Sequence, residues 1–584
     1  MLALDKSLTL ERQFNPISME VFSNRLLSIT EMMAINIMRA SFSAQIKERR
    51  DFSVGLFTAD GRLLCQGTHV PLQLGSLVGG MRALLARYSF DEIREGDAFI
   101  CNDVYLAGGT HLPDITIVSP IHKHGELVGF AANIGHHSDI GGSVPGSVSA
   151  KAKTVFEEGI RLPIIRLQRE GEIDRDLLNL IAQNSRLPEE RSLDLQVQIA
   201  TNSRGGAAVC ELIDQMGLEA YKDAIEDTLG YTARRLRKRV EDLADGSHSF
   251  TTYLDDDGQG GDQVPVTVTA TISGDSLLLD LEGTGPQARG ALNVTDSALK
   301  ATIYYSVKVL LDPDLLPNSG MMDAITIKAP EGTIANPVHP AAVGARSITC
   351  QKIAGAVFGA LGQFLPDTVR MASCYDVLPS ISFSGRRFGS ERFYVFGETL
   401  GGGGGATAVS DGMSAIHVHV TNTLNMPTEA LENEFPLQVD EYGVVENSSG
   451  AGRYRGGLGI VRQIRALRDE TIFSGRSDNH KRGSAGFAGG LPGGKGRLLR
   501  NFGTDACESL VSKVAHIVLN ADETMRIETA GGGGFGPPEE RTAKALADDI
   551  FDGIISIEKA SQDYGAEKTE AALKLLPPGM RPRS

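Results

Sequence analysis

Two short turns in the first quarter of the chain hold most of the residues that could do chemistry. The first has the sequence GGTHLPD and the second NIGHHSD, and together they supply His111, Asp114, His136, His137 and Asp139. Imidazole and carboxylate groups without thiolates are typical ligands of zinc, manganese or iron. Such a cation, held with open coordination positions, can activate water and polarise a carbonyl group. The residue types therefore indicate a hydrolytic metal site.

These side chains meet only if the segments that follow and precede the two turns pair with each other. Asp114–His122 and Leu127–Ile134 surround a Lys-His-Gly turn, which predicts a β-hairpin. In an antiparallel pair the start of the first strand lies opposite the end of the second. We therefore expect His111 and Asp114 to lie beside His136 and His137.

The spacing leaves two questions open. It does not choose a fourth ligand, because Asp51, Asp103 and Asp139 are all available. It also allows a purely structural interpretation, in which the histidines cap turns and Asp114 is an ordinary turn residue.

Other motifs give weaker indications. Residues 489–496, GGLPGGKG, match part of a phosphate-binding loop, but Gly496 replaces the hydroxyl residue that would hold magnesium and Pro492 lacks an amide hydrogen. We therefore expect no ATP site there. The glycine runs Gly401–Gly405 and Gly531–Gly534 are predicted to be turns, with an anion-binding nest as the less favoured alternative.

A second pair of histidines lies in the sequence Ile-His-Val-His-Val. Its alternation predicts His417 and His419 on one face of a strand, about 7 Å apart. Without a nearby carboxylate-rich turn, we interpret them as hydrogen-bonded structural residues rather than metal ligands. The six cysteines form no CxxC pair, so we expect reduced thiols and no disulfide framework.

The elements that must position the two turns follow from hydrophobic periodicity. Apolar residues from Met19 to Ile37 recur every three or four positions, which predicts a long helix. Hairpins are expected near Ser53–Gln66 and at the two turns, helices at 182–243, 298–311 and 348–361, and strands from residue 250. The fold class predicted is α+β, with four domains: 1–250 (metal-binding, α+β), 251–384 (mixed), 385–536 (glycine-rich β) and 537–584 (helical tail).

Composition limits the partners. Lys plus Arg is 57 against 73 for Asp plus Glu, a net charge of −16, which disfavours nucleic acid and anionic membranes as partners. No window approaches the roughly 18 uninterrupted apolar residues of a membrane span. The charged first 14 residues lack the apolar core of a signal peptide, so a cytoplasmic location is expected.

Several long motifs, in order along nearly the whole chain, resemble the hydantoinase B/oxoprolinase family. They are DFSVGLF from Asp51, the two turns, VPGS from Val144, NSRLPEER from Asn184, APEG from Ala329, GAGRYRGGLG from Gly450 and the closing glycine run. The resemblance implies a B-type subunit of a hetero-oligomer whose A-type partner binds ATP and Mg²⁺ and phosphorylates a small cyclic amide: a lactam, a hydantoin or 5-oxoproline.

The same resemblance implies a divalent metal, zinc or alternatively manganese or iron, held by Asp51, His111, Asp114 and His136. Metal-activated water would then open the phosphorylated ring, with His137 or Asp139 orienting a ligand or moving the proton. Related complexes carboxylate ketones such as acetone or acetophenone, so a ketone carboxylase subunit is an alternative function. A non-catalytic scaffold for the ATPase partner is another.

Overall fold

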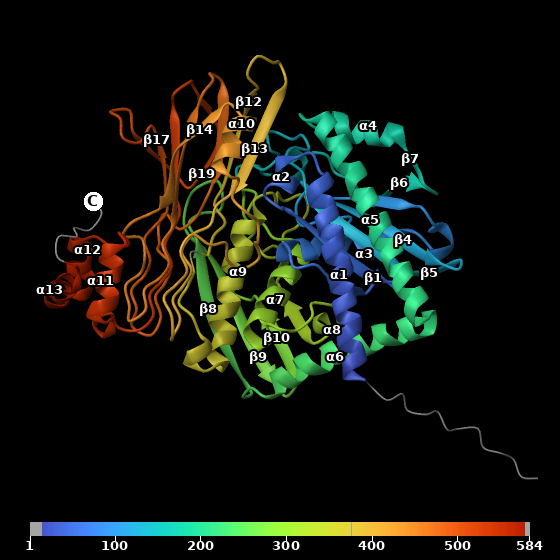
Figure 1. Ribbon diagram of the computed structural model, residues 1–584, viewed down its shortest axis with the longest axis horizontal. Helices are drawn as coiled ribbons and strands as arrows, with labels where there is room; N and C mark the ends of the chain where they lie inside the picture. Colours follow the sequence, from blue (N-terminus) through green and yellow to red (C-terminus); the bar gives the residue numbers. More distant parts are fainter. Residues whose placement is uncertain (1–14, 375, 578–584) are drawn as a thin grey trace, which may run out of the picture.

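The computed structural model describes residues 15–374 and 376–577 (Figure 1). Helices and strands are mixed along the whole of this range, which confirms the α+β class. Residues 1–14, on which the expectation of no signal peptide rests, lie outside it. Within the described ranges, no helix has both the length and the apolar character needed to cross a membrane. The four-domain division stays a prediction.

The N-terminal helix α1, Pro16–Ala40, forms as expected. Asn15 caps it by accepting hydrogen bonds from the backbone N–H groups of Ile17 and Ser18. The predicted apolar stripe from Met19 to Ile37 is its buried face. This face packs against the long helix α5, Pro188–Met216, which in turn covers β4 and β5. Two helices therefore back the strands that carry the metal-ligand candidates.

A seven-stranded sheet carries both turns. Its order is β2-β1-β5-β4-β3-β6-β7, with bounds β1 Phe52–Thr58, β2 Leu63–Gln66, β3 Ala98–Cys101, β4 Asp114–Lys123, β5 Glu126–His136, β6 Ile165–Arg169 and β7 Glu172–Ile173. Both predicted hairpins are confirmed, because β1 pairs with β2 and β4 with β5. The remaining helices of this part are α2 Ala44–Lys47, α3 Leu74–Arg87, α4 Arg175–Gln183 and α6 Leu218–Glu241. Gly217, at a φ of 86°, separates α5 from α6 within the helical region expected at 182–243.

The middle of the chain forms a second, four-stranded sheet, coloured green in Figure 1. Its order is β11-β10-β9-β8, with bounds β8 Gly246–Leu254, β9 Val264–Ser273, β10 Ser276–Asp280 and β11 Ile325–Lys328. The predicted helices appear as α7 Asp296–Leu311 and α9 Arg346–Leu361, with a short α8 Ser319–Met322 between them. One apolar cluster joins this part to the first sheet, since it contains both Phe130 of β5 and Ile353 of α9.

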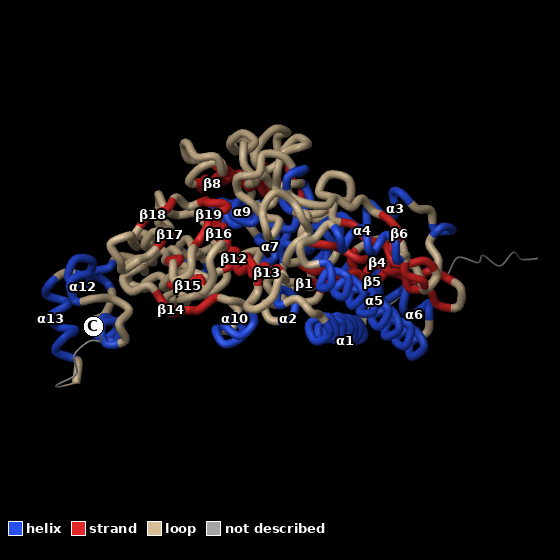
Figure 2. Tube along the Cα trace, turned by 90° about the horizontal axis from the view of Figure 1, so that it is seen from above, coloured by secondary structure: helices blue, strands red, loops and turns tan. Residues whose placement is uncertain are grey.

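Two further antiparallel sheets pack face to face in the C-terminal third. They are β13-β12-β16-β19 (Phe393–Thr399, Ser380–Arg386, Thr471–Arg476, Lys513–Leu519) and β14-β15-β20-β17-β18 (Leu437–Val444, Ile460–Ala466, Thr524–Glu528, Arg497–Arg500, Glu508–Leu510). Phe383, Phe473 and Ile527 belong to their shared core, and α10, Thr428–Glu434, flanks it. The expected helical tail consists of three short helices, α11 Ala543–Phe551, α12 Ile557–Tyr564 and α13 Ala566–Leu575. These lie at the opposite end of the molecule from α5 (Figure 2).

The glycine runs are not the turns that the sequence predicts. Gly401–Gly405 and Gly531–Gly534 have no positive φ and lie extended, backbone against backbone. The N–H of Gly403 donates to the carbonyl of Ala530, and that of Gly532 to the carbonyl of Gly457. A Cβ at Gly532 would lie 1.9 Å from the carbonyl oxygen of Gly404. Glycine is needed here because chains approach closely, not because they turn.

Gly532→Ala is therefore expected to lower the free energy of unfolding by about 1–3 kcal/mol, as overpacking does elsewhere. The carbonyl of Gly404, which the new methyl group would meet, is held by a hydrogen bond from the N–H of Gly457. Gly443→Ala is the matched control, because the nearest atom to its added Cβ is 3.9 Å away. Thermal unfolding should show a lower midpoint for Gly532→Ala alone; equal midpoints would contradict the close-approach argument.

Candidate metal centre

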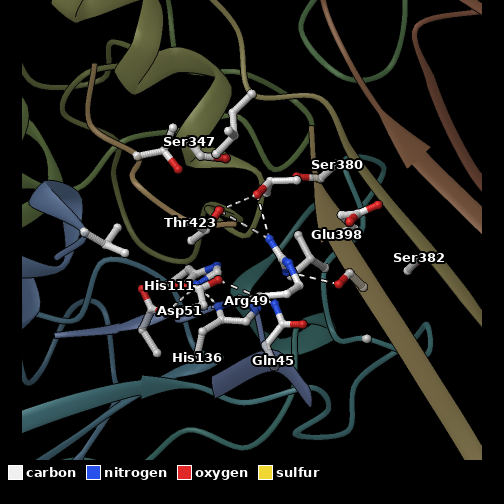
Figure 3. Close-up of a pocket in the computed structure, with 18 of the residues that line it drawn as sticks. Gln45, Arg49, Asp51, His111, His136, Ser347, Ser380, Ser382, Glu398 and Thr423 are labelled. Carbon is white, nitrogen blue, oxygen red and sulfur yellow. Dashed lines mark hydrogen bonds and ion pairs between the residues drawn. The ribbon is translucent and has the colours of Figure 1, made fainter. Parts of the chain in front are cut away.

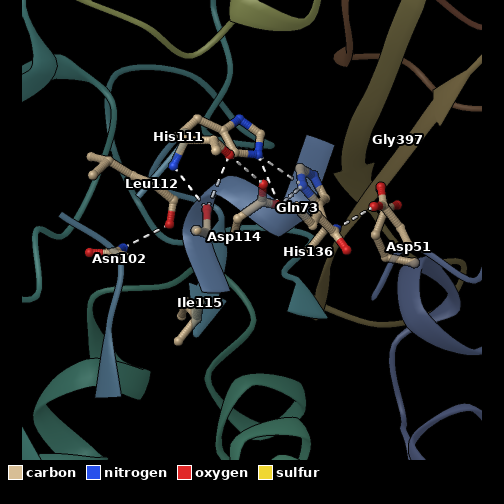
Figure 4. Close-up of polar contacts among 12 residues, drawn as sticks. Asp51, Gln73, Asn102, His111, Leu112, Asp114, Ile115, His136 and Gly397 are labelled. Atoms are coloured by element: carbon tan, nitrogen blue, oxygen red, sulfur yellow. Dashed lines mark hydrogen bonds and ion pairs between the residues drawn. The ribbon is translucent and has the colours of Figure 1, made fainter. Parts of the chain in front are cut away.

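The β4–β5 hairpin brings three of the candidate ligands together. Asp114 opens β4 directly opposite His136, the last residue of β5. Asp114 Oδ1 lies 3.0 Å from both His111 Nε2 and His136 Nδ1, and these two nitrogens are 3.2 Å apart (Figure 4). The predicted antiparallel pairing is confirmed, and it brings His111 and Asp114 beside His136, but not His137, from two separate turns.

Burial and charge set the protonation of this group. His111 is 2% exposed and Asp114 is 1% exposed. Burial, and then the positive charge of Arg346, lowers the pKa of His111 to about 3. Burial would raise the pKa of Asp114, but His111 and Arg346 hold it well below its usual range. At neutral pH His111 is therefore neutral and Asp114 ionised, the forms that bind a cation.

The orientation of the His111 ring is also set. Its Nδ1 lies 3.1 Å from the carbonyl oxygen of Gly344, so Nδ1 carries the hydrogen and donates it to that oxygen. This leaves the lone pair of Nε2 facing Asp114 and His136. Ligand atoms of the three residues all lie within 4.8 Å of one another. Two imidazoles and one carboxylate in this arrangement fit a divalent cation such as zinc, manganese or iron.

Asp51 lines the same pocket, but its carboxylate is not part of the 4.8 Å group. Its Oδ1 accepts a hydrogen bond from Gln73 Nε2 at 3.0 Å, and Gln45 Nε2 lies 3.5 Å from Oδ2. Asp51 is tied to the group through the backbone, because its carbonyl accepts the N–H of His136. Its role as a fourth ligand stays a prediction.

The other candidates face away from the pocket. His137, buried, has its Nε2 3.0 Å from Gln198 Oε1, and Asp103 forms an ion pair with Arg161 at 2.8 Å. Asp139, also buried, accepts hydrogen bonds from the backbone N–H groups of Gly141 and Gly146, and Arg186 completes its shell at 2.9 Å. His137 and Asp139 thus hold the loop after β5 in place. Their expected catalytic roles stay predictions.

Three arginines line the pocket, two of them buried and Arg476 partly buried, and no sequence motif singled them out. They come from segments far apart in the chain: Arg49 from just after α2, Arg346 from the start of α9 and Arg476 from the end of β16. Arg49 reaches across the pocket to the carbonyl of Gly397 at 3.0 Å and the hydroxyl of Thr399 at 2.6 Å (Figure 3). The only local signal was that Arg49 lies two residues before Asp51.

The positive charge in this pocket is only partly neutralised. Arg346 pairs with Asp114 at 2.8 Å, and the pocket carboxylate of Glu398 pairs with Arg462 at 3.0 Å. Among the ion pairs of the described residues, none involves Arg49 or Arg476. The Nε atoms of Arg49, Arg346 and Arg476 are buried without a hydrogen-bond partner. Burial, and then the charges of Arg346 and Arg49, lowers the pKa of Arg476 to about 9. Such a pocket is suited to an oxyanion.

The other histidine pair differs from expectation. Residues 417–419 do not form a strand, so the predicted common strand face is wrong. Both side chains are hydrogen-bonded, as expected: His417 Nδ1 lies 3.4 Å from Thr421 Oγ1 and His419 Nε2 lies 2.9 Å from Asp376 Oδ1. The carboxylate beside His419 is Asp376, which lies 43 residues earlier in the chain and not in a neighbouring turn.

Comparison with known proteins extends over the whole described fold. The family model for hydantoinase B/oxoprolinase matches residues 15–538. An uncharacterised protein of Methanocaldococcus jannaschii is 34% identical over 553 residues, covering 94% of this chain and 95% of its own. The crystal structure of the ATP-dependent caprolactamase of Pseudomonas jessenii superimposes with a TM-score of 0.87 at 25% identity, covering 96% of this chain and 99% of the other. A nucleotide-free acetone carboxylase structure shares the fold, with a TM-score of 0.86 at 20% identity over 96% of this chain and 82% of the other.

Proposed function

The chain belongs to the hydantoinase B/oxoprolinase family, and from this premise we propose that it is the B-type subunit of an ATP-dependent cyclic-amide hydrolase. Its substrate would be a hydantoin, 5-oxoproline or a lactam, activated by an A-type partner that binds ATP and Mg²⁺. The net reaction converts cyclic amide, ATP and two waters into the ring-opened acid, ADP and phosphate. The observation that carries the proposal is the buried group His111, Asp114 and His136 beside three arginines.

The donor set supports a divalent metal held by His111, Asp114 and His136, with Asp51 as the proposed fourth ligand. When bound, such a cation lowers the pKa of a coordinated water from about 15.7 toward about 7 and polarises a substrate oxygen. The hydrogen bond from His111 to Gly344 fixes the tautomer that can bind it. His137 and Asp139 would act as positioning residues, since they hold the loop that follows His136.

The arginines would act on the phosphoryl group. A cyclic amide is a poor electrophile, and phosphorylation of its oxygen makes the ring carbon easier to attack. Neither Arg49 nor Arg476 forms a close ion pair within the described structure, although Asp51 and Glu398 lie near enough to Arg49 to act on its charge. Both guanidinium groups would bind phosphoryl oxygens. Charge held there would be stabilised as the ring opens and as phosphate leaves.

The test is turnover by the chain purified together with its A-type partner. With ATP and a panel of hydantoin, 5-oxoproline and caprolactam, we expect ring opening of at least one amide, coupled to ADP formation. The control omits this chain and should show no ring opening.

A second function has one observation in its favour, the fold shared with acetone carboxylase. The test is ATP-dependent incorporation of labelled bicarbonate into acetone or acetophenone. If this occurs without amide hydrolysis, the carboxylase function is supported and the hydrolase function is rejected. Full ring opening by variants of His111 and Asp114 would instead favour a scaffold role.

A further inference from the structure

A second group of potential ligands lies outside the site described above. Cys374 and Asp376 come from the segment before β12, and His419 comes from the loop 43 residues beyond Asp376. All three side chains are buried, and one ligand atom from each lies within 4.8 Å of the other two. His419 Nε2 and Asp376 Oδ1 are 2.9 Å apart.

The chemistry of this group differs from that of the first. A thiolate beside imidazole and carboxylate favours zinc or another thiophilic divalent cation, whereas an all-oxygen site would favour magnesium or calcium. The backbone N–H of Gly405 donates to Cys374 Sγ at 3.4 Å, which is the kind of contact that supports a metal-bound thiolate. Without a cation, burial raises the pKa of the Cys374 thiol to about 12, so a role as a free nucleophile has no support.

The group also borders an open space. Cys374 and His419 line a cavity of about 630 Å³, whose other walls include Tyr304, Tyr305 and Phe358. Thr421 lines both this cavity and the first pocket, so the two lie side by side. Three protein ligands with a fourth position facing a cavity is the arrangement of zinc sites that bind a further ligand.

We propose that Cys374, Asp376 and His419 form a second metal site, for zinc or a similarly thiophilic divalent cation, with an open coordination position toward this cavity. The proposal does not depend on the reaction assigned to the first site. It predicts that the chain binds two cations through independent sets of residues.

The test uses the full chain stripped of metal, reloaded with zinc, desalted and analysed for elemental zinc. Wild type should retain about two zinc ions per chain, Cys374→Ser about one and His111→Ala about one. Cys350→Ser is the matched control, because Cys350 is a buried thiol on α9 outside both groups and should retain two. In the cobalt-loaded protein, a near-ultraviolet thiolate-to-cobalt absorption band should be present in wild type and His111→Ala and absent in Cys374→Ser.

The proposal is overturned if wild type binds no zinc that depends on Cys374, or if the cobalt band is absent or survives in Cys374→Ser. Should Cys374→Ser misfold by circular dichroism, His419→Gln and Asp376→Asn replace it, and each must lose one zinc. Loss of zinc from His111→Ala alone would support the first site while rejecting the second. The two sites are therefore judged separately.

Discussion

Asp114→Asn is expected to abolish ATP-dependent ring opening, with a loss of about a thousandfold or more in turnover. Asp114 Oδ1 lies 3.0 Å from a nitrogen of each histidine, and Oδ2 forms the ion pair with Arg346. Removing the charge takes away the only carboxylate within the three-residue group. We expect the cation to be lost with it, which elemental analysis of the purified variant checks.

We choose asparagine because it keeps the shape of the side chain. Asp114→Ala would instead leave Arg346 in a buried space without its partner, at a cost of about 3–5 kcal/mol. Asp440→Asn is the control, since Asp440 on β14 pairs with Arg465 on β15 and neither residue lines either pocket. It should retain metal and turnover. Wild-type ring opening by Asp114→Asn that has lost the metal would reject the metal mechanism, whereas wild-type ring opening with the metal retained would reject Asp114 as an essential ligand.

The hairpin that builds the metal centre could be predicted from sequence because its information is local. Two β-forming runs around a Lys-His-Gly turn predict the antiparallel pairing, which brings Asp114 near the end of the second strand. The exact partner depends on an irregularity between Ile121 and His122, which shifts the register by one residue and places Asp114 opposite His136. The long helix α1 could be predicted for the same reason, because the spacing of its apolar residues is also local information. The position of Asp51 also follows from pairing, since β1 lies beside β5 and pairs Phe52 with Gly135.

The arginines could not be predicted, because what brings them together is tertiary. Arg49 and Arg476 are 427 positions apart in the chain. They line one pocket only because the third sheet, through β13, packs against α2. Local sequence around Arg476 is an ordinary strand end. Cys374 and His419 could not be paired from the sequence either, because they reach their shared cavity on two separate loops.

The prediction that the glycine runs form turns was wrong for a different physical reason. Glycine has two uses, positive φ and close approach, and sequence does not tell them apart. At Gly532 the second applies, since the space for a Cβ is taken by the carbonyl of Gly404. Turn statistics therefore predicted the wrong structure from a correct observation of excess glycine.

Arg476→Met is expected to lower turnover by about a hundredfold or more while leaving the metal in place. Arg476 supplies positive charge where we place the phosphoryl group, and loss of one such donor typically costs about 100- to 1,000-fold in rate. In the described structure its side chain donates a hydrogen bond from Nη1 to the carbonyl of Val148, at 3.1 Å. It contacts none of the three metal-ligand candidates, so zinc content should match wild type. Arg465→Met is the control, because Arg465 on β15 is partly exposed and lines neither pocket, and it should keep full turnover.

Arg476→Met should be no less stable than wild type. A loss of turnover in this variant would therefore not result from unfolding. A buried guanidinium without a carboxylate partner, close to Arg49 and Arg346, is costly until an anion arrives. Replacing it by an apolar side chain removes that cost, so the thermal midpoint should hold or rise. Added phosphate should raise the midpoint of wild type, since it binds only the folded chain, and should raise that of Arg476→Met much less. If phosphate stabilises both proteins equally, or if Arg476→Met turns over normally, the phosphoryl group binds elsewhere and Arg476 serves only the packing of β16 against Val148.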